Sequence, residues 1–251
     1  MKILTAIDDT DSLEISSTGE LAGMVAAEVE ARGWGRHSAV TRHQLLLHPD
    51  IPYTSHNSSM CFELDLEKSY LKPFIELAEA MLTRESAPGS DPGLCIAVVD
   101  DIADPGLLID FGYRAKKHVL VKEDAYALAR KLKVHLSEHG GTGQGVIGAL
   151  AGVGLRLTGN DGRFQGQVRL ATAEDGTASV AEIIGRTKAG LVRSLDGRVL
   201  ADEERVFIGD NWLKLVLLDN KAMLLVCRDA AESSGRPLRW RVCTREELQD
   251  Y

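Results

Sequence analysis

Three aspartates, Asp8, Asp9 and Asp11, lie within four residues near the start of the chain. They follow a short apolar run, residues 3–7, which predicts a buried β-strand that ends in a polar loop. Carboxylates at the end of a strand are well placed to hold Mg²⁺ against substrate phosphates, because this ion prefers oxygen ligands. A solvated acidic turn would contain the same residues, so the pattern supports both interpretations about equally.

A glycine-rich segment at residues 140–148 is the second candidate for chemistry. It precedes a run of small and apolar residues, which predicts a closely packed helix. Glycines let backbone N–H groups approach phosphate oxygens, and a helix N-terminus favours anions. The segment has neither the Walker A lysine nor the dinucleotide fingerprint at a first strand, so close helix packing is an equal alternative. As a phosphate loop it would use Gly141, Thr142, Gly143 and Gly145.

Basic residues cluster at 114–118, before a predicted helix that starts at Lys122. If this cluster faces the acidic loop, Lys116 would complement the charge of a bound phosphate. A solvated basic face would look the same.

The composition of the chain argues against several classes of protein. The chain has 251 residues, with 29 Lys and Arg against 37 Asp and Glu, and this acidic balance argues against a broad basic surface for nucleic acid. Four cysteines lie far apart, without a CxxC pair or a Cys/His spacing of the zinc-ribbon kind, so neither a structural zinc nor a disulfide scaffold is predicted. The sequence contains neither a signal-peptide core nor a membrane-spanning run, so we expect a cytoplasmic protein that does not enter a membrane.

Periodicity predicts alternating strands and helices in the first two thirds of the chain. The expected strands are residues 3–7, 44–47, 60–66 and 94–99, and the expected helices are 18–32, 71–82, 122–139 and the run after residue 145. After residue 163 short alternating stretches separated by turns predict a β-rich region.

Several motifs occur in one order between residues 1 and 165. They are IDDTDS at 7–12, Ser17 and Thr18 ahead of Leu21, HPDIPY at 48–53 with Asn57 behind it, PGL at 92–94, and GQGVIGALAGVGL at 143–155. This ordered set resembles the archaeal 2-agmatinylcytidine synthetases that act on isoleucine tRNA.

The resemblance implies an ATP-dependent enzyme of the α+β class. Its kinase-like domain would comprise residues 1–60 and 111–165, around a ferredoxin-like domain at 61–110, and a β-rich C-terminal domain would follow at 166–251. The resemblance also implies that Asp8, Asp9 and Asp11 hold Mg²⁺, and that Thr18 handles phosphate together with Asp9. Asn57 is the residue that this chain keeps from the family's TRGN-like loop.

The departures from the family concern the acceptor. The chain has ISSTG where the family has GMCTT, and the family's OB-fold and zinc ribbon are not recognisable after residue 165. We therefore expect an ATP- and Mg²⁺-dependent phosphotransfer or ligase-type enzyme that acts on a small molecule or an RNA, with tRNA disfavoured by the net charge.

Two alternatives fit the same residues. One is a non-catalytic nucleotide-binding or regulatory module. The other is a tRNA-modifying enzyme whose β-rich tail replaces the RNA-binding domains. The tail's candidates for RNA contact flank Trp240, and they are Arg236, Arg239, Arg241 and Arg245. An amphipathic edge strand would contain the same residues.

Overall fold

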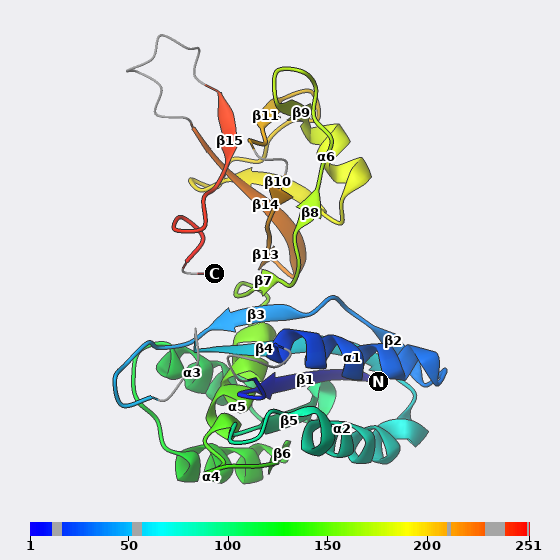
Figure 1. Ribbon diagram of the computed structural model, residues 1–251, viewed down its shortest axis with the longest axis vertical. Coiled ribbons are helices and arrows are strands. Elements are labelled where there is room, and N and C mark those ends of the chain that lie inside the picture. The colour runs from blue at the N-terminus through cyan, green and yellow to red at the C-terminus, as the bar shows by residue number, and fades with distance from the viewer. Residues whose placement is uncertain (12–16, 52–56, 210–211, 229–238, 250) are drawn as a thin grey trace. The chain divides into compact units, whose positions relative to one another are not determined.

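A computed structural model describes residues 1–11, 17–51, 57–209, 212–228, 239–249 and 251 (Figure 1). The chain forms two compact units, Met1–Thr158 and Gly159–Tyr251. The domain boundaries that the resemblance implies, at residues 60, 110 and 165, stay predictions.

An antiparallel sheet lies at the centre of the first unit. Its strands are hydrogen-bonded in the order β6-β5-β1-β4-β3, and β2 also pairs with β4. The bounds are β1 Lys2–Asp8, β2 Gly35–His37, β3 Thr41–Gln44, β4 Ser58–Leu66, β5 Gly93–Val98 and β6 His135–Glu138. Because β1 lies between β4 and β5, its carboxyl end has a hydrogen-bonded strand on each side.

Helices cover both faces of this sheet. Because successive side chains of β1 point to opposite faces, the strand packs against both layers of helices. Ile3 and Ile7 pack with α1 and α2, whereas Leu4 and Ala6 pack with α3, α4 and α5. The helices are α1 Thr18–Ala31, α2 Leu71–Glu85, α3 Pro105–Ala115, α4 Lys122–Leu132 and α5 Gly145–Leu157, with short 3₁₀ turns at Lys68–Tyr70 and Val99–Asp101. The result is a three-layer unit, and the expected mixed α+β class is confirmed.

Helix α5 is buried along most of its length, as the small and apolar residues predict. A Cβ at Gly154 would overlap the backbone carbonyl of Leu108 in α3, and a Cβ at Gly152 would overlap Ser59 in β4. Glycine at these positions therefore lets α5 lie directly on the sheet and on α3.

Most of the predicted elements are present. Helix α1 is an example in which local sequence signals mark both ends. Its capping box joins Ser17 to Glu20, and Gly33 follows its end with φ +68°.

Two predicted elements are wrong in part, and α3 was not predicted. The helix expected over 122–139 ends at Leu132, because Lys133 has a left-handed backbone with φ +58°, and the chain continues as strand β6. The strand expected over 44–47 is β3, which covers Thr41–Gln44; the Leu45 amide still donates to the carbonyl of Asn57, but the Leu46 amide leaves the sheet and donates to the carbonyl of Ala115.

The second unit is β-rich, as predicted. Its hydrogen-bonded order is β7-β13-β14-β15-β11-β9, with β10 on β14 and a separate β8–β12 pair. The bounds are β7 Arg163–Phe164, β8 Val168–Arg169, β9 Thr177–Ser179, α6 Val180–Arg186, β10 Leu191–Ser194, β11 Arg205–Phe207, β12 Trp212–Leu213, β13 Leu215–Leu218, β14 Lys221–Arg228 and β15 Trp240–Val242. Its core is separate from the two clusters of the first unit.

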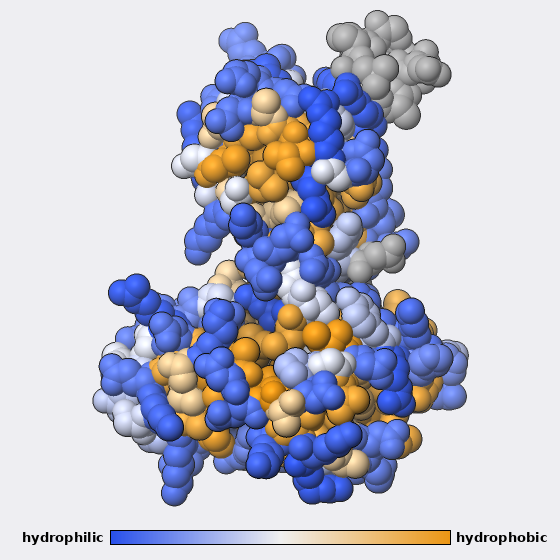
Figure 2. All heavy atoms as spheres, turned by 180° about the vertical axis from the view of Figure 1, so that it is seen from behind, coloured by the Kyte–Doolittle hydropathy of each residue, from blue (hydrophilic) through white to orange (hydrophobic). Residues whose placement is uncertain are grey.

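Hydrophobic residues are also visible on the surface of each unit, among hydrophilic ones (Figure 2). Among the described residues, none of the helices combines the length and apolar character that crossing a membrane requires.

Candidate functional site

Strand β1 ends at Asp8, whose side chain is enclosed by the fold. The residue is only 8% exposed, and it lies opposite Gly93 of β5 in the sheet. Its carboxylate stands against α5, where a Cβ at Gly148 would overlap it. Burial raises the pKa of the Asp8 carboxyl well above its usual range, and the charge of Asp9 raises it further.

Asp9 begins the loop that follows the strand. Its backbone has φ +53°, in the left-handed region that aspartate tolerates better than most residues. Burial, followed by the charges of Asp91 and Asp11, raises the pKa of Asp9 to about 6. The carboxylates of Asp8, Asp9, Asp11 and Asp91 therefore act on one another through space, and a bound cation would relieve their mutual repulsion.

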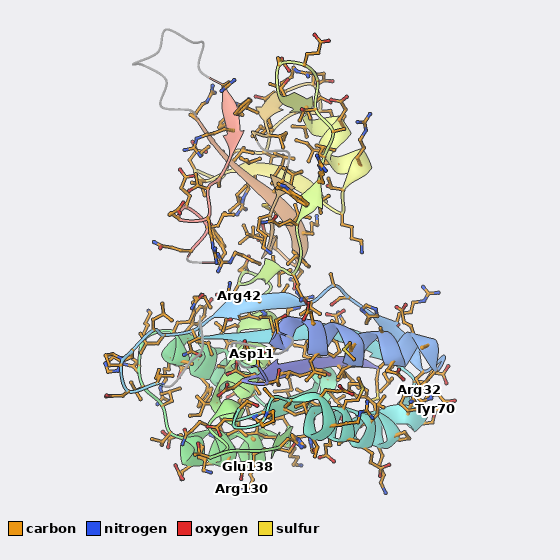
Figure 3. The ribbon with its side chains drawn as sticks, in the orientation of Figure 1. Asp11, Arg32, Arg42, Tyr70, Arg130 and Glu138 are labelled. Carbon is orange, nitrogen blue, oxygen red and sulfur yellow. The ribbon has the colours of Figure 1, made fainter. Side chains whose placement is uncertain are left out.

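Thr18 connects the acidic loop to α1. Its hydroxyl donates to Asp11 Oδ1 over 3.0 Å and accepts from the Thr10 amide over 3.4 Å. Thr18 is 4% exposed and is the first residue of the capped helix, so its side chain is held in place. Figure 3 shows Asp11 beside the tip of β1 and the start of α1. The structure thus brings the predicted Thr18, Asp9 and Asp11 into one site.

The glycine-rich loop closes around Asp91. The Thr142 amide donates to Asp91 Oδ1, the Thr142 hydroxyl donates to Oδ2 over 2.6 Å, and the Gly143 amide donates to Oδ1 over 3.3 Å. A Cβ at Gly141 would overlap the same carboxylate, and Gly141 and Gly143 both have positive φ. The Gly145 amide, at the start of α5, donates to the backbone carbonyl of Asp91 over 3.1 Å. The loop amides therefore bind an anionic group that the chain itself supplies.

Lys122 supports this loop from α4. Its Nζ donates to the Thr142 carbonyl over 2.7 Å and to Glu138 Oε2 over 3.3 Å. Sequence reasoning missed Asp91, Lys122 and Glu138. Asp91 belongs to a linker rich in proline and glycine, where an aspartate is expected as a turn residue, so local pattern gave no signal for it.

Asn57 and the end of α3, next to Lys116, are both hydrogen-bonded to Leu46. The Asn57 side-chain amide donates to the Leu46 carbonyl over 2.8 Å, and the Leu46 amide donates to the carbonyl of Ala115, the neighbour of Lys116. Lys116 itself ends helix α3. Most of the polar loop that precedes Asn57, residues 52–56, lies outside the described part of the chain.

The basic cluster around Trp240 is engaged within the second unit. Trp240 is 7% exposed and its indole N–H donates to Glu204 over 3.0 Å, while Arg241 pairs with Glu247 over 2.8 Å. The Arg239 guanidinium lies 3.7 Å from the centroid of the Phe207 ring. Trp240 therefore serves the core of this unit and offers no open face for a base, and Arg236 lies outside the described residues.

The acidic loop offers the type of ligand that a hard divalent cation prefers, although the three ligand atoms found within 4.8 Å of one another among the described residues belong to Cys227, Cys243 and Glu247 and not to this loop. Asp8, Asp9 and Asp11 offer carboxylate oxygens, which Mg²⁺ prefers, and the pKa of Asp9 is raised first by burial and then by the charges of Asp91 and Asp11, which a bound cation would offset.

We compared the chain with known proteins. No protein-family model matches the sequence. The chain is 31% identical over 160 residues to the uncharacterized protein MJ0921 of Methanocaldococcus jannaschii; the match covers 61% of this chain and 50% of that protein. The chain thus spans about half the length of the curated relative that it matches.

Solved structures also match 61% of the chain. The complex of TiaS with its tRNA and ATP matches with a TM-score of 0.53 and 26% identity over 36% of that chain. Apo TiaS, an agmatidine synthetase of an isoleucine tRNA, matches with a TM-score of 0.52 and 25% identity over 35% of its chain. A tRNA fluorescent labeling enzyme matches with a TM-score of 0.53 and 26% identity over 36% of its chain. The matched part of this chain therefore has a fold similar to that of TiaS.

Proposed function

We propose that this chain is an ATP- and Mg²⁺-dependent enzyme of the phosphotransfer or ligase type, acting on an RNA or small-molecule acceptor. The similar structures include TiaS with ATP and tRNA, so nucleotide use by the shared fold supports the proposal. The predicted arrangement of a two-segment kinase-like domain around a ferredoxin-like one is part of this proposal.

One observation carries it. The buried carboxylate of Asp8, at the end of β1, lies against Gly148 of α5, and Asp11 in the loop that follows accepts a hydrogen bond from Thr18. Asp8, Asp9 and Asp11 would hold Mg²⁺, which would neutralise phosphate charge. The Asp11 carboxylate accepts a hydrogen bond from the Thr18 hydroxyl, which would increase the electron density of the Thr18 oxygen and hold it in place for a transferred phosphoryl group. Catalysis of this kind depends mainly on positioning and electrostatics.

The remaining predicted residues would bind the nucleotide. Gly141, Thr142, Gly143 and Gly145 would shape the phosphate loop, with Asp91 as its internal support in the free protein. Asn57 and Lys116 would contact the nucleotide from the side of Leu46.

Calorimetry tests the nucleotide site. We expect ATP to bind the wild-type chain only with Mg²⁺, and Asp9→Asn to lose that binding while it keeps the shape of the residue. Asp100→Asn is the matched control, because Asp100 is an exposed aspartate in the turn Val99–Asp101. Equal ATP binding by wild type and Asp9→Asn would overturn the assignment of the acidic loop.

A second candidate is a non-catalytic nucleotide-binding module. The observation in its favour is that the Thr142 and Gly143 amides are already bound to Asp91, so the loop has an acceptor without any phosphate. Turnover separates the two candidates. Enzyme with Mg²⁺ and ATP should yield ADP, AMP or a phosphorylated Thr18, whereas a binding module would bind ATP and leave it intact.

A further inference from the structure

Two cysteines and a glutamate meet at the end of the second unit. Strands β14 and β15 are antiparallel neighbours, with Cys227 opposite Arg241, and the Cys243 amide continues the pairing by donating to the Leu225 carbonyl. Cys227 and Cys243 therefore share one face of the sheet, because side chains two positions apart on a strand point the same way. Glu247 returns to them from the turn that follows β15. The Sγ atoms and one carboxylate oxygen all lie within 4.8 Å of one another.

The separations suit a tetrahedral ion. Cys227 Sγ lies 3.6 Å from both carboxylate oxygens of Glu247. With Zn–S near 2.3 Å and Zn–O near 2.0 Å, a tetrahedron places sulfur and oxygen ligands about 3.5 Å apart and two sulfurs about 3.8 Å apart. The three side chains thus need little movement to share one ion.

Arg241 fixes the orientation of the glutamate. Its two terminal nitrogens donate to the two Glu247 oxygens over 2.8 Å each, and the Thr244 amide donates to Oε2 over 2.8 Å. Outer partners of this kind are typical of ligating carboxylates.

Charge also balances at this site. Two thiolates and one carboxylate bring three negative charges, and a divalent ion together with Arg241 brings three positive charges. This neutrality matters because Cys227 and Cys243 are both half-buried.

We propose that Cys227, Cys243 and Glu247 bind Zn²⁺, with the fourth coordination position taken by water. Binding replaces one proton on each thiol with a metal–sulfur bond, so two protons leave for each ion bound. The ion would clamp residues 243–247 onto strand β14. The spacing of these residues matches no zinc-ribbon pattern, because pairing of β14 with β15, and not a local turn, brings the two cysteines together.

Cobalt substitution tests the site in the reduced full-length chain. We expect one tetrahedrally coordinated Co²⁺ per chain, with strong visible absorption and a thiolate-to-cobalt charge-transfer band that Zn²⁺ removes. Cys227→Ser and Cys243→Ser should each reduce the charge-transfer band and weaken binding more than Arg241→Lys does, which we expect to weaken it about 10- to 100-fold. Glu246→Gln, at the exposed neighbour of Glu247, is the matched control and should bind as wild type.

A second measurement needs no variant. Zn²⁺ should protect Cys227 and Cys243 of the wild-type chain from alkylation, as identified by peptide mass spectrometry. Unchanged alkylation with Zn²⁺, a weak octahedral Co²⁺ spectrum, wild-type affinity in Cys227→Ser, or a Cys227–Cys243 disulfide that forms as fast with Zn²⁺ as without it would each overturn the proposal.

Discussion

At the scale of single residues, the titration of Asp9 makes the free energy of unfolding depend on pH. Its pKa is raised from 3.8 to about 6 in the folded chain, so the folded state holds this proton more tightly than the unfolded state does. The contribution of Asp9 to the free energy of unfolding is therefore lost as pH rises from about 3.8 to about 6. Asp9→Asn, which carries no charge at any pH, should be more stable than wild type above pH 6 by about 1 to 2 kcal/mol, allowing for solvent screening.

Urea unfolding of both proteins at a series of pH values measures this difference. The gap in the free energy of unfolding should close toward pH 3.8. A gap that is constant with pH would mean that Asp9 titrates normally. Saturating Mg²⁺ should shrink the gap at high pH if the acidic loop holds the ion.

Asp91 offers a second prediction at the same scale. Asp91→Ala removes the acceptor of the Thr142 and Gly143 amides, and an orphaned amide costs about 1–3 kcal/mol. Hydrogen exchange of residues 140–145 should accelerate by at least about tenfold, the equivalent of about 1.4 kcal/mol.

A matched variant separates local from general effects. Asp104→Ala also removes a carboxylate that accepts a backbone amide, that of Gly106 at the start of α3. In Asp104→Ala, faster hydrogen exchange should be confined to the residues near Gly106. If Asp91→Ala left residues 140–145 as protected as in wild type, Asp91 would not be what holds the glycine-rich loop.

These residues also show what the sequence could predict about the site. Asp8, Asp9 and Asp11 stand out because three carboxylates follow an apolar strand within four positions, and the glycines stand out by their density. Asp91 could not be found in this way, because its partners lie 51 and 52 positions further along the chain. Only the approach of β5 to the start of α5, where a Cβ at Gly93 would overlap Gly145, brings them together.

At the scale of elements, the hydrophobic period predicted most of the helices and strands of the first unit but not α3 or β6, and backbone conformation decided where elements end. The period of α4 runs on past Leu132, but Lys133 adopts the left-handed conformation that usually marks glycine. A lysine carries no sequence signal for such a stop, so the predicted helix continued through β6. The boundary of α1 was predictable because Ser17, Glu20 and Gly33 are typical capping residues.

The left-handed backbone of Lys133 leads us to predict that a glycine substitution at this position increases stability, whereas glycine inside a helix usually decreases it. Lys133→Gly should raise the free energy of unfolding by about 0.5–1 kcal/mol, because glycine adopts this conformation without steric conflict. Ala127→Gly, at an exposed position inside the same helix, should lower it by about 1 kcal/mol. Thermal unfolding of wild type and both variants measures these two changes in stability. A loss of stability in both would mean that residue 133 does not end the helix in this conformation.

At the scale of the whole molecule, two units with separate cores need not unfold together. Residues 1–158 are built around two buried clusters on the two faces of one sheet, and residues 159–251 have clusters of their own. The proposed ligands are also divided, because the acidic loop belongs to the first unit and Cys227, Cys243 and Glu247 belong to the second. A ligand that binds only the folded form of one unit stabilises that unit by mass action.

Differential scanning calorimetry of the full chain should therefore resolve two transitions that respond to different ligands. Mg²⁺ with ATP should raise the midpoint of one transition, and Zn²⁺ should raise that of the other, each by several degrees, since about 2.7 kcal/mol is gained at a hundredfold excess over Kd. Asp9→Asn should abolish the first shift and keep the second, and Cys227→Ser should do the reverse. A single transition that both ligands raise would show instead that the two units unfold cooperatively, and loss of both shifts in either variant would contradict the assignment of the two sites to separate units.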